Sequence, residues 1–169
     1  MDELKVTWIL SNEIDYSFSI KQVYGFLFDN FGRILVHDDL GRFNLPGGKP
    51  EKDETVIQTL ERECIEESQV TFKEPELIGF QLVENDKDYN YKPYIQLRFI
   101  AKIDQLFPLL PDPVTSRAYK RSLVSISQVN TLLKWGEAGR VQLEAAVKKI
   151  KNKLCIEIDQ YMEKRIIDE

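Results

Sequence analysis

Three glutamates, Glu63, Glu66 and Glu67, lie within one short stretch of the chain and have the right chemistry to act together. In a helix each residue turns by about 100°, so side chains three and four residues apart share one side. Like charges at this spacing destabilise a helix by roughly 0.2 to 0.5 kcal/mol per pair. A hard cation reverses that cost, because Mg²⁺ prefers oxygen ligands and is held by a few carboxylates together with phosphate oxygens. The spacing therefore predicts a divalent-cation site, with Mg²⁺ as the expected ion and Mn²⁺ as the alternative.

The segment around these glutamates has the features of a helix that can position them. Asp53 or Thr55 can cap its start, and Thr55 followed by Gln58 is typical of a capping box. An apolar face recurs at helical spacing: Val56, Ile57, Leu60 and Cys64. Glu63 and Glu67 fall on the border of this face and Glu66 just beyond it, while Arg62 can orient Glu66 from one turn away. The alternative interpretation is a solvated acidic face with an incidental salt bridge.

The order of residues in this region closely resembles the signature of the Nudix hydrolases. Gly48 is followed after five residues by Glu54, and after seven more by the run Arg62-Glu63-Cys64-Ile65-Glu66-Glu67-Ser68-Gln69-Val70. Six of the seven fixed identities of that signature are present. Cys64 replaces the usual aliphatic residue, which is a mild change since a buried thiol behaves as a small hydrophobe. Gln69 replaces the final glycine, the residue best able to end a helix in the left-handed conformation.

The resemblance implies an α/β fold of the Nudix type: an α/β/α sandwich with a mixed β-sheet and, in this chain, a long C-terminal helix. It also implies an activity, the Mg²⁺-dependent hydrolysis of a nucleoside diphosphate linked to another moiety, by attack of water on phosphorus. The implied metal ligands are Glu63, Glu66, Glu67 and the carbonyl of Gly47, and the catalytic set is Glu63, Glu66, Glu67 and Arg62. One of the glutamates, or an acidic residue from a loop, takes the proton from water.

Other polar residues have more than one interpretation. Glu54 is expected to be structural, because its charge suits a helix start. His37, the single histidine, is expected to be a strand-end residue and not a base. Candidates for an additional carboxylate, otherwise solvated loop residues, are Glu84, Asp86 and Asp88. Candidates for substrate contact, otherwise surface or packing residues, are Tyr89, Arg117 and Lys120, together with Tyr91, Tyr94 and Arg121.

Composition limits the class of protein. With 169 residues, 43% hydrophobic and 30% charged, the chain suits a single domain over 1–169. The net charge of −5 argues against an extended nucleic-acid surface, and the Nudix resemblance implies a small nucleotide-type substrate as partner. Two cysteines, no apolar run of membrane-spanning length and no signal-peptide pattern predict a cytoplasmic protein. A non-catalytic nucleotide-sensing or protein-binding module on the same fold is the alternative function, and Gln69 is the feature that leans towards it.

The remaining elements follow from periodicity. Strands are expected at 6–10, 18–29, 33–37, 76–84, 94–103 and 123–126, with a turn at 30–32 and a polar loop at 85–93. A short helix is expected from a cap at Ser127 to about Trp135. A helical extension at 137–167 is expected to cover the sheet, and a dimerisation helix that would make a homodimer is the alternative.

Overall fold

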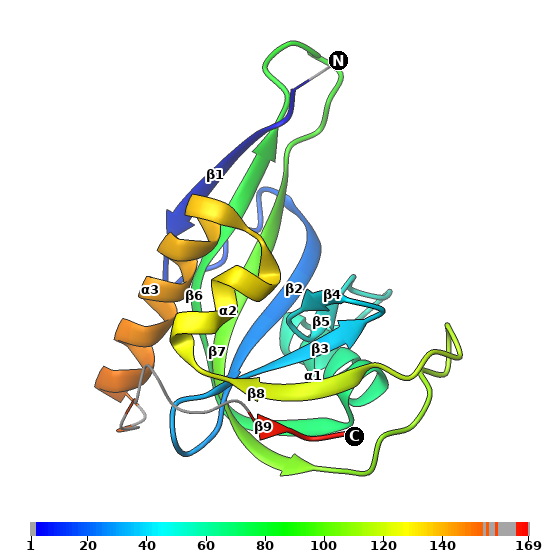
Figure 1. Ribbon diagram of the computed structural model, residues 1–169. Coiled ribbons are helices and arrows are strands. Elements are labelled where there is room, and N and C mark those ends of the chain that lie inside the picture. Colours follow the sequence, from blue (N-terminus) through cyan, green and yellow to red (C-terminus); the bar gives the residue numbers. More distant parts are fainter. Residues whose placement is uncertain (1–2, 154, 156–157, 159–164, 169) are drawn as a thin grey trace.

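The computed structural model describes residues 3–153, 155, 158 and 165–168, and within them a mixed sheet is flanked by helices (Figure 1). The strands are β1 (Lys5–Leu10), β2 (Ser19–Phe28), β3 (Ile34–Asp39), β4 (Arg42–Asn44), β5 (Gly47–Gly48), β6 (Val70–Glu84), β7 (Tyr94–Leu106), β8 (Lys120–Val124) and β9 (Arg165–Ile166). The helices are α1 (Val56–Ser68), α2 (Ile126–Leu133) and α3 (Gly136–Lys153).

The sheet runs in the order β1-β6-β7-β2-β3-β8-β9, with β4 paired to β3 and β5 paired to β2. Only the pairing of β2 with β7 is parallel among the described strands, which makes the sheet mixed. β2 and β3 pair at a single position, Phe28 with Ile34, so the two strands diverge beyond it. The short strand β5 joins β2 in that gap through Val23 and Tyr24. This divergence gives the loop before α1 its place beside the sheet.

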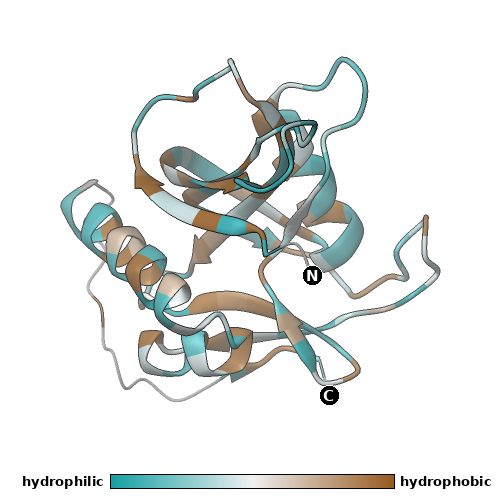
Figure 2. Cartoon of the chain, turned by 90° about the horizontal axis from the view of Figure 1, so that it is seen from above, coloured by the Kyte–Doolittle hydropathy of each residue, from teal (hydrophilic) through white to brown (hydrophobic). Residues whose placement is uncertain are grey.

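Two apolar cores lie on opposite faces of the sheet. Leu60 and Cys64 of α1 are fully buried against one face, and Val129 of α2 and Ala146 and Ile150 of α3 are fully buried against the other. Figure 2 shows this layering from above, with brown, hydrophobic strands between the helices and mostly teal loops around them. The predicted α/β/α sandwich is confirmed, as is the expectation that the C-terminal helix covers the sheet.

Several predicted boundaries are wrong. β6 starts at Val70 and β7 continues to Leu106, because the two pair along nearly their whole length through register shifts that the alternation pattern does not reveal. The strand expected at 123–126 lies at Lys120–Val124. Ser125, and not Ser127, precedes α2 as its N-cap residue. Periodicity does not predict the two short strands β4 and β5, which have too few residues to show an alternation.

The C-terminal segment also departs from the prediction of one helix over 137–167. Helix α3 ends at Lys153, Cys155 has a positive φ of 47°, and Arg165–Ile166 form strand β9 against β8. Leu154 and Met162, part of the predicted apolar repeat, lie outside the described residues. A three-to-four-residue repeat of apolar side chains alone does not exclude a short strand, which is why the prediction extends too far. None of the described helices has the length and apolarity needed to cross a membrane.

Candidate active site

Helix α1 carries the three glutamates at the edge of its buried face. Thr55 caps the helix by accepting the N–H of Gln58, whose side chain accepts the N–H of Thr55 in return, at 3.2 and 2.9 Å. This confirms the predicted capping box. Because Leu60 and Cys64 face the core, the neighbouring carboxylates are drawn out of solvent: the side chains of Glu63, Glu66 and Glu67 are 15, 20 and 17% exposed.

Arg62 joins the acidic residues to one another. Its Nε donates to Oε1 of Glu54 at 2.6 Å, and its Nη1 donates to Oε1 of Glu63 at 2.9 Å and Oε2 of Glu66 at 3.2 Å. Its Nη2 reaches Oε2 of Glu54 at 3.1 Å and the carbonyl of Lys49 at 3.0 Å. The fork geometry of a guanidinium allows one side chain to satisfy this many acceptors. Arg62 therefore fixes the directions in which Glu63 and Glu66 point.

The carboxylates fall into two electrostatic classes. The hydrogen bonds from Arg62 lower the pKa of Glu54 to about 2, so this residue is the stable counterion of the arginine. Burial instead raises the pKa of Glu63, and it raises the pKa of Glu67 to about 8 against the opposing bond from Gly47. Burial thus disfavours the charged form of Glu63 and Glu67, and a positive ligand would favour it again.

Two glycines bring the loop before α1 into contact with these side chains. The N–H of Gly47 donates to Oε1 of Glu67 at 3.0 Å. Gly47 has a φ of 153°, and a Cβ there would lie 2.1 Å from the carbonyl oxygen of Val23. At Gly48 a Cβ would lie 2.3 Å from Oε1 of Glu63. Gly47 therefore needs the absence of a side chain, because backbone occupies the space, whereas a side chain at Gly48 would displace the carboxylate of Glu63.

Asp112, in the loop between β7 and β8, adds an acidic side chain that the sequence reasoning missed. It is 6% exposed, and its Oδ1 accepts the N–H groups of Val114 and Thr115 at 2.7 and 2.9 Å. It lies close enough to Glu63 and Glu67 for its charge to add to the effect of burial in raising the pKa of both. The only signal in the sequence is an aspartate between two prolines in a loop that must return the chain to β8.

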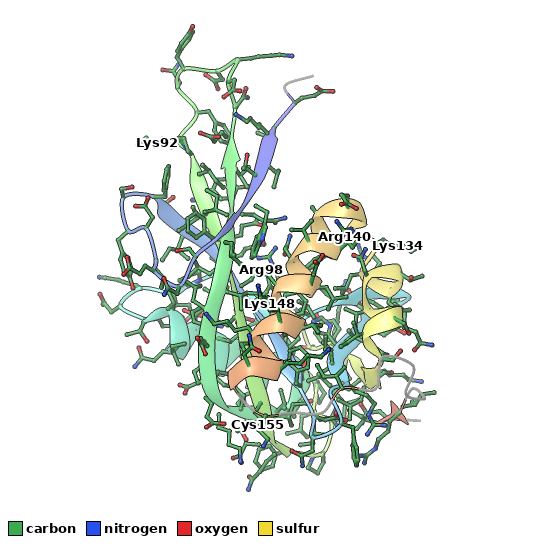
Figure 3. The ribbon with its side chains drawn as sticks, turned by 90° about the vertical axis from the view of Figure 1, so that its left-hand side faces the viewer. Lys92, Arg98, Lys134, Arg140, Lys148 and Cys155 are labelled. Atoms are coloured by element: carbon green, nitrogen blue, oxygen red, sulfur yellow. The ribbon has the colours of Figure 1, made fainter. Side chains whose placement is uncertain are left out.

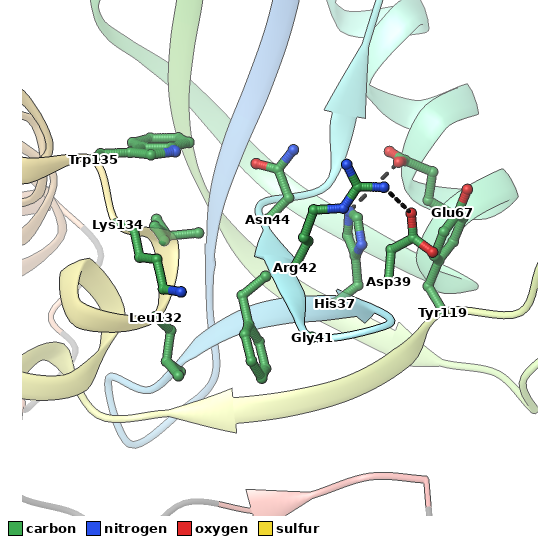
Figure 4. A pocket seen from close by; sticks show the side chains of 12 residues that line it. His37, Asp39, Gly41, Arg42, Asn44, Glu67, Tyr119, Leu132, Lys134 and Trp135 are labelled. Carbon is green, nitrogen blue, oxygen red and sulfur yellow. Dashed lines mark ion pairs between the residues drawn. The ribbon is translucent and has the colours of Figure 1, made fainter.

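A cavity of about 480 Å³ opens beside Glu67 (Figure 4). One wall comes from the β3–β4 hairpin through His37, Arg42 and Asn44, and the opposite wall comes from the connection between α2 and α3 through Trp135. The cavity combines aromatic, amide and charged groups, which is the usual lining of a small-molecule site. The sequence does not predict it, because its walls come from segments far apart along the chain.

His37 faces this cavity and lies within β3, not at the end of a strand as predicted. It is 4% exposed, its Nε2 lies 3.5 Å from Oε2 of Glu67, and its ring stacks obliquely on Tyr119 at 5.2 Å. Neither ring nitrogen makes a hydrogen bond of good geometry to any residue that the structure describes. Burial lowers the pKa of His37, which favours the neutral ring at neutral pH. A neutral imidazole in this place can donate or accept a hydrogen bond with a ligand.

A buried arginine supports the Trp135 wall. The guanidinium of Arg98 lies 5.1 Å from the ring centroid of Trp135 and 4.9 Å from that of Tyr24. It donates to Gln142 of α3 at 2.9 Å and to Gln81 of β6 at 3.0 Å, and Figure 3 places it between the sheet and α3. Cation–π contacts of this kind hold aromatic rings in fixed positions. The indole of Trp135 is therefore held in a fixed position although the residue lies in the connection between α2 and α3.

The predicted substrate residues are distributed unevenly around the site. Arg117 donates to Asp39, a cavity residue, at 3.1 Å, so it lies near the rim. Lys120 is exposed at the start of β8. Tyr89 is fully exposed on the β6–β7 loop, which Figure 1 shows at the end of the molecule away from α1, so the structure does not bring it to the glutamates.

Other residues named for substrate or proton transfer also lie elsewhere. Arg121 is 2% exposed and is bonded to Asp168 and to two backbone carbonyls, so the interpretation as a phosphate contact is wrong for it. The rings of Tyr91 and Tyr94 pack against each other at 6.4 Å. Glu84 and Asp86 are ion-paired with Lys5 at 3.9 and 3.8 Å at the same end of the sheet as Tyr89, and Asp88 follows in the same loop.

The donor set suits a divalent cation that is shared with a ligand. Within the described residues, no three acidic, histidine or cysteine side chains converge as a complete cage. Instead, Glu67, whose pKa is raised, lines an open cavity, and on the same helix Glu63 and Glu66 are bonded to Arg62. Mg²⁺ is typically bound in this way, by one or two carboxylates, waters and substrate phosphates. The residues therefore fit the ion that the glutamate spacing predicts.

Comparisons with known proteins agree with this fold. The NUDIX domain family matches residues 20–145. No curated protein sequence gives a significant match. The chain is similar in structure to a mutant of the pyrophosphohydrolase BsRppH of Bacillus subtilis, with 20% identity, a TM-score of 0.64, and coverage of 90% of this chain and 93% of that one. It is also similar to a NUDIX hydrolase from Nitrosomonas europaea, with 18% identity, a TM-score of 0.57, and coverage of 78% of this chain and 88% of that one. A MutT protein from Bacillus halodurans is similar too, with 20% identity, a TM-score of 0.55, and coverage of 73% of this chain and 78% of that one.

Proposed function

The chain belongs to the Nudix family, and we propose that it is a divalent-metal-dependent pyrophosphohydrolase that cleaves a nucleoside diphosphate linked to another moiety. The observation that carries this proposal is the set of half-buried glutamates on α1. Burial raises the pKa of Glu63 and Glu67, Arg62 bonds to Glu63 and Glu66, and Glu67 borders a cavity. Such a cluster only costs stability unless a cation and a phosphate ligand complete it.

Each residue has a proposed role. Glu63, Glu66, Glu67 and the carbonyl of Gly47 hold the ion, which when bound neutralises pyrophosphate oxygens and lowers the pKa of a bound water. Arg62 orients Glu63 and Glu66 through the bonds described above. A carboxylate of this set, or Asp112 from the β7–β8 loop, takes the proton from the attacking water.

The cavity beside Glu67 is the proposed place for the part of the substrate beyond the phosphates. Asn44 and His37 offer hydrogen bonds on one wall and Trp135 offers an aromatic face on the other. Arg117, near the rim, and Lys120 are proposed phosphate contacts, and Tyr89 lies too far from the glutamates to be proposed as one.

The test is turnover of a panel of nucleoside diphosphate derivatives with Mg²⁺ or Mn²⁺, in which products are identified by chromatography. The panel includes nucleoside triphosphates, nucleotide sugars and dinucleoside polyphosphates. Glu67→Gln is the paired variant, because it keeps the size of the side chain but removes the charge. Metal-dependent cleavage by the wild type and its loss in Glu67→Gln are expected. Binding of nucleotide without cleavage of any compound would favour the non-catalytic module instead.

A further inference from the structure

The end of helix α1 is closed by a side chain in place of a glycine. Gln69 has the left-handed backbone conformation, with a φ of 42°, and is 5% exposed. Its Nε2 donates to the carbonyls of Ile65 and Glu66, both at 3.0 Å. The carbonyl of Ile65 also accepts the main-chain N–H of Gln69 at 3.2 Å, and that of Glu66 belongs to the last turn, whose carbonyls lack partners within the helix. A glycine would adopt this backbone conformation at lower cost, but it has no side chain with which to make the two bonds of Nε2.

The same side chain reaches the loop that carries Asp112. Oε1 of Gln69 accepts the N–H of Leu110 at 3.1 Å, and the main-chain carbonyl of Gln69 accepts the N–H of Phe107 at 2.8 Å. These bonds fix the orientation of the carboxamide: its nitrogen must face the helix carbonyls, to which it donates, and its oxygen must face the N–H of the loop, from which it accepts. One amide joins the last turn of the glutamate helix to the segment 107–113.

Arg121 joins the same two segments a second time. Its Nη1 donates to the carbonyl of Ser68, the last residue of α1, at 2.9 Å and to the carbonyl of Phe107 at 2.8 Å. Asp168 holds the guanidinium from the other side, with bonds of 2.9 Å to Nε and to Nη2. We call Gln69 and Arg121 together the loop clamp. A buried, multiply bonded clamp is a rigid connection, because each group would lose its partners on moving.

We propose that the loop clamp sets the position of Asp112 against Glu63 and Glu67, and that Gln69 is a positioning residue for this fourth carboxylate. The proposal rests on the proposed function of the site. Asp112 is buried, and its Oδ1 is held by its own loop, so its direction depends on where that loop lies. The loop in turn is tied to α1 by Gln69 and Arg121. The residue that departs from the family motif is thus one of the two that bond the end of α1 to the loop of Asp112.

The experiment is a double-mutant cycle with Gln69→Gly and Asp112→Asn, read out by Mn²⁺ affinity from electron paramagnetic resonance and by kcat and KM separately. Gln69→Gly restores the motif residue and relieves the backbone, yet we expect Mn²⁺ affinity and kcat to fall about 10-fold or more, since groups next to the ligands of a metal ion, as Asp112 would be, typically contribute 10- to 100-fold. Asp112→Asn should cause a similar loss. In the Asp112→Asn background, Gln69→Gly should add less than about 2-fold, because the residue it positions is already neutral.

Two further variants distinguish the loss of Asp112 positioning from a general loss of stability. Glu74→Gly is the matched control: Glu74 is exposed, has a φ of 55° and lies in a bulge of β6, so glycine relieves the same backbone conformation without touching the clamp. Its Mn²⁺ affinity should equal that of the wild type. Gln69→Met keeps the length of the side chain without the amide and should behave like Gln69→Gly. If Gln69→Gly fails to fold, Gln69→Met replaces it in the double-mutant cycle.

Three results would overturn the proposal: wild-type Mn²⁺ affinity in Gln69→Gly, fully additive losses in the double mutant, or unchanged hydrogen exchange at the Leu110 N–H in Gln69→Gly. Metal affinity and amide exchange need no substrate. If the wild type cleaves nothing in the nucleotide panel, the proposed reaction fails while the clamp is still judged by these two measurements.

Discussion

Replacing Gly48 by alanine isolates the metal site from the stability of the fold. The added Cβ would lie 2.3 and 2.8 Å from the two carboxylate oxygens of Glu63, whereas comfortable contacts are about 3.5 Å, so the carboxylate must move by about 1 Å. It can do so by a change of rotamer, but the 2.9 Å bond from Arg62 is then lost or weakened. No positive φ is imposed at Gly48, so alanine itself causes no backbone strain there.

The expected stability change is small and the expected metal effect is large. Alanine reduces the entropy of the unfolded chain by about 0.4 to 1 kcal/mol, which offsets much of the lost bond to Glu63. The unfolding free energy should therefore change by less than about 1 kcal/mol. Mn²⁺ affinity should fall about 10- to 100-fold, equivalent to about 1.4 to 2.7 kcal/mol, because one carboxylate no longer points to the ion.

Calorimetric titration with Mn²⁺ and urea unfolding in chelator measure the two quantities. Gly136→Ala is the opposite control, since Gly136 has a φ of 60° and open space where a Cβ would lie. It should lose about 1 to 2 kcal/mol of stability through backbone strain and keep its metal affinity. Wild-type Mn²⁺ affinity in Gly48→Ala would refute the assignment of Glu63 as a ligand.

The remaining predictions concern charge in the same site. In chelator, the wild type should lose on the order of a few kcal/mol of unfolding free energy as pH rises from about 5 to 8, because the pKa of Glu67 is about 8 in the folded protein against an ordinary value of 4.5 in the unfolded chain. The sign follows because both states are protonated below 4.5, whereas above 8 the folded state holds a buried charge. Urea titrations of Glu67→Gln across this range should show a much flatter profile, and equal slopes would contradict the burial argument. Arg62→Lys should lower kcat about 10- to 100-fold, since an ammonium cannot satisfy Glu54, Glu63 and Glu66 together; steady-state kinetics showing less than a 2-fold change would contradict the orienting role.

The glutamate helix can be predicted from the sequence because every feature that defines it is local. The cap at Thr55, the apolar repeat through Leu60 and Cys64, and the border position of the carboxylates all depend on residues within one or two turns. The layered fold can likewise be predicted, because the strand sequences either alternate between apolar and polar residues or are continuously apolar, and because the motif implies the family. The spacing predicts that Arg62 orients Glu66, and the structure adds its bonds to Glu63 and Glu54.

The rest of the site depends on contacts between distant segments. Asp112 comes near the glutamates from a distant segment, and its loop is bonded to the end of α1 by groups as far apart as Gln69 and Leu110, 41 residues along the chain. The place of His37 cannot be predicted, because a lone histidine carries no local signal for burial beside a distant glutamate. Strand β9 escapes prediction for a related reason: its pairing with β8 is long-range, and the apolar repeat of the preceding helix continues into it.

The position of Trp135 has a practical consequence for measuring ligand binding. The chain has two tryptophans, Trp135 on the cavity wall and Trp8 on strand β1, packed over Gly79 at the sheet edge. Replacing Trp8 by phenylalanine leaves a single indole whose emission reports directly on its surroundings. Quenching or a spectral shift on addition of a nucleotide then gives an optical titration of the unlabelled protein, independent of whether any bond is cleaved.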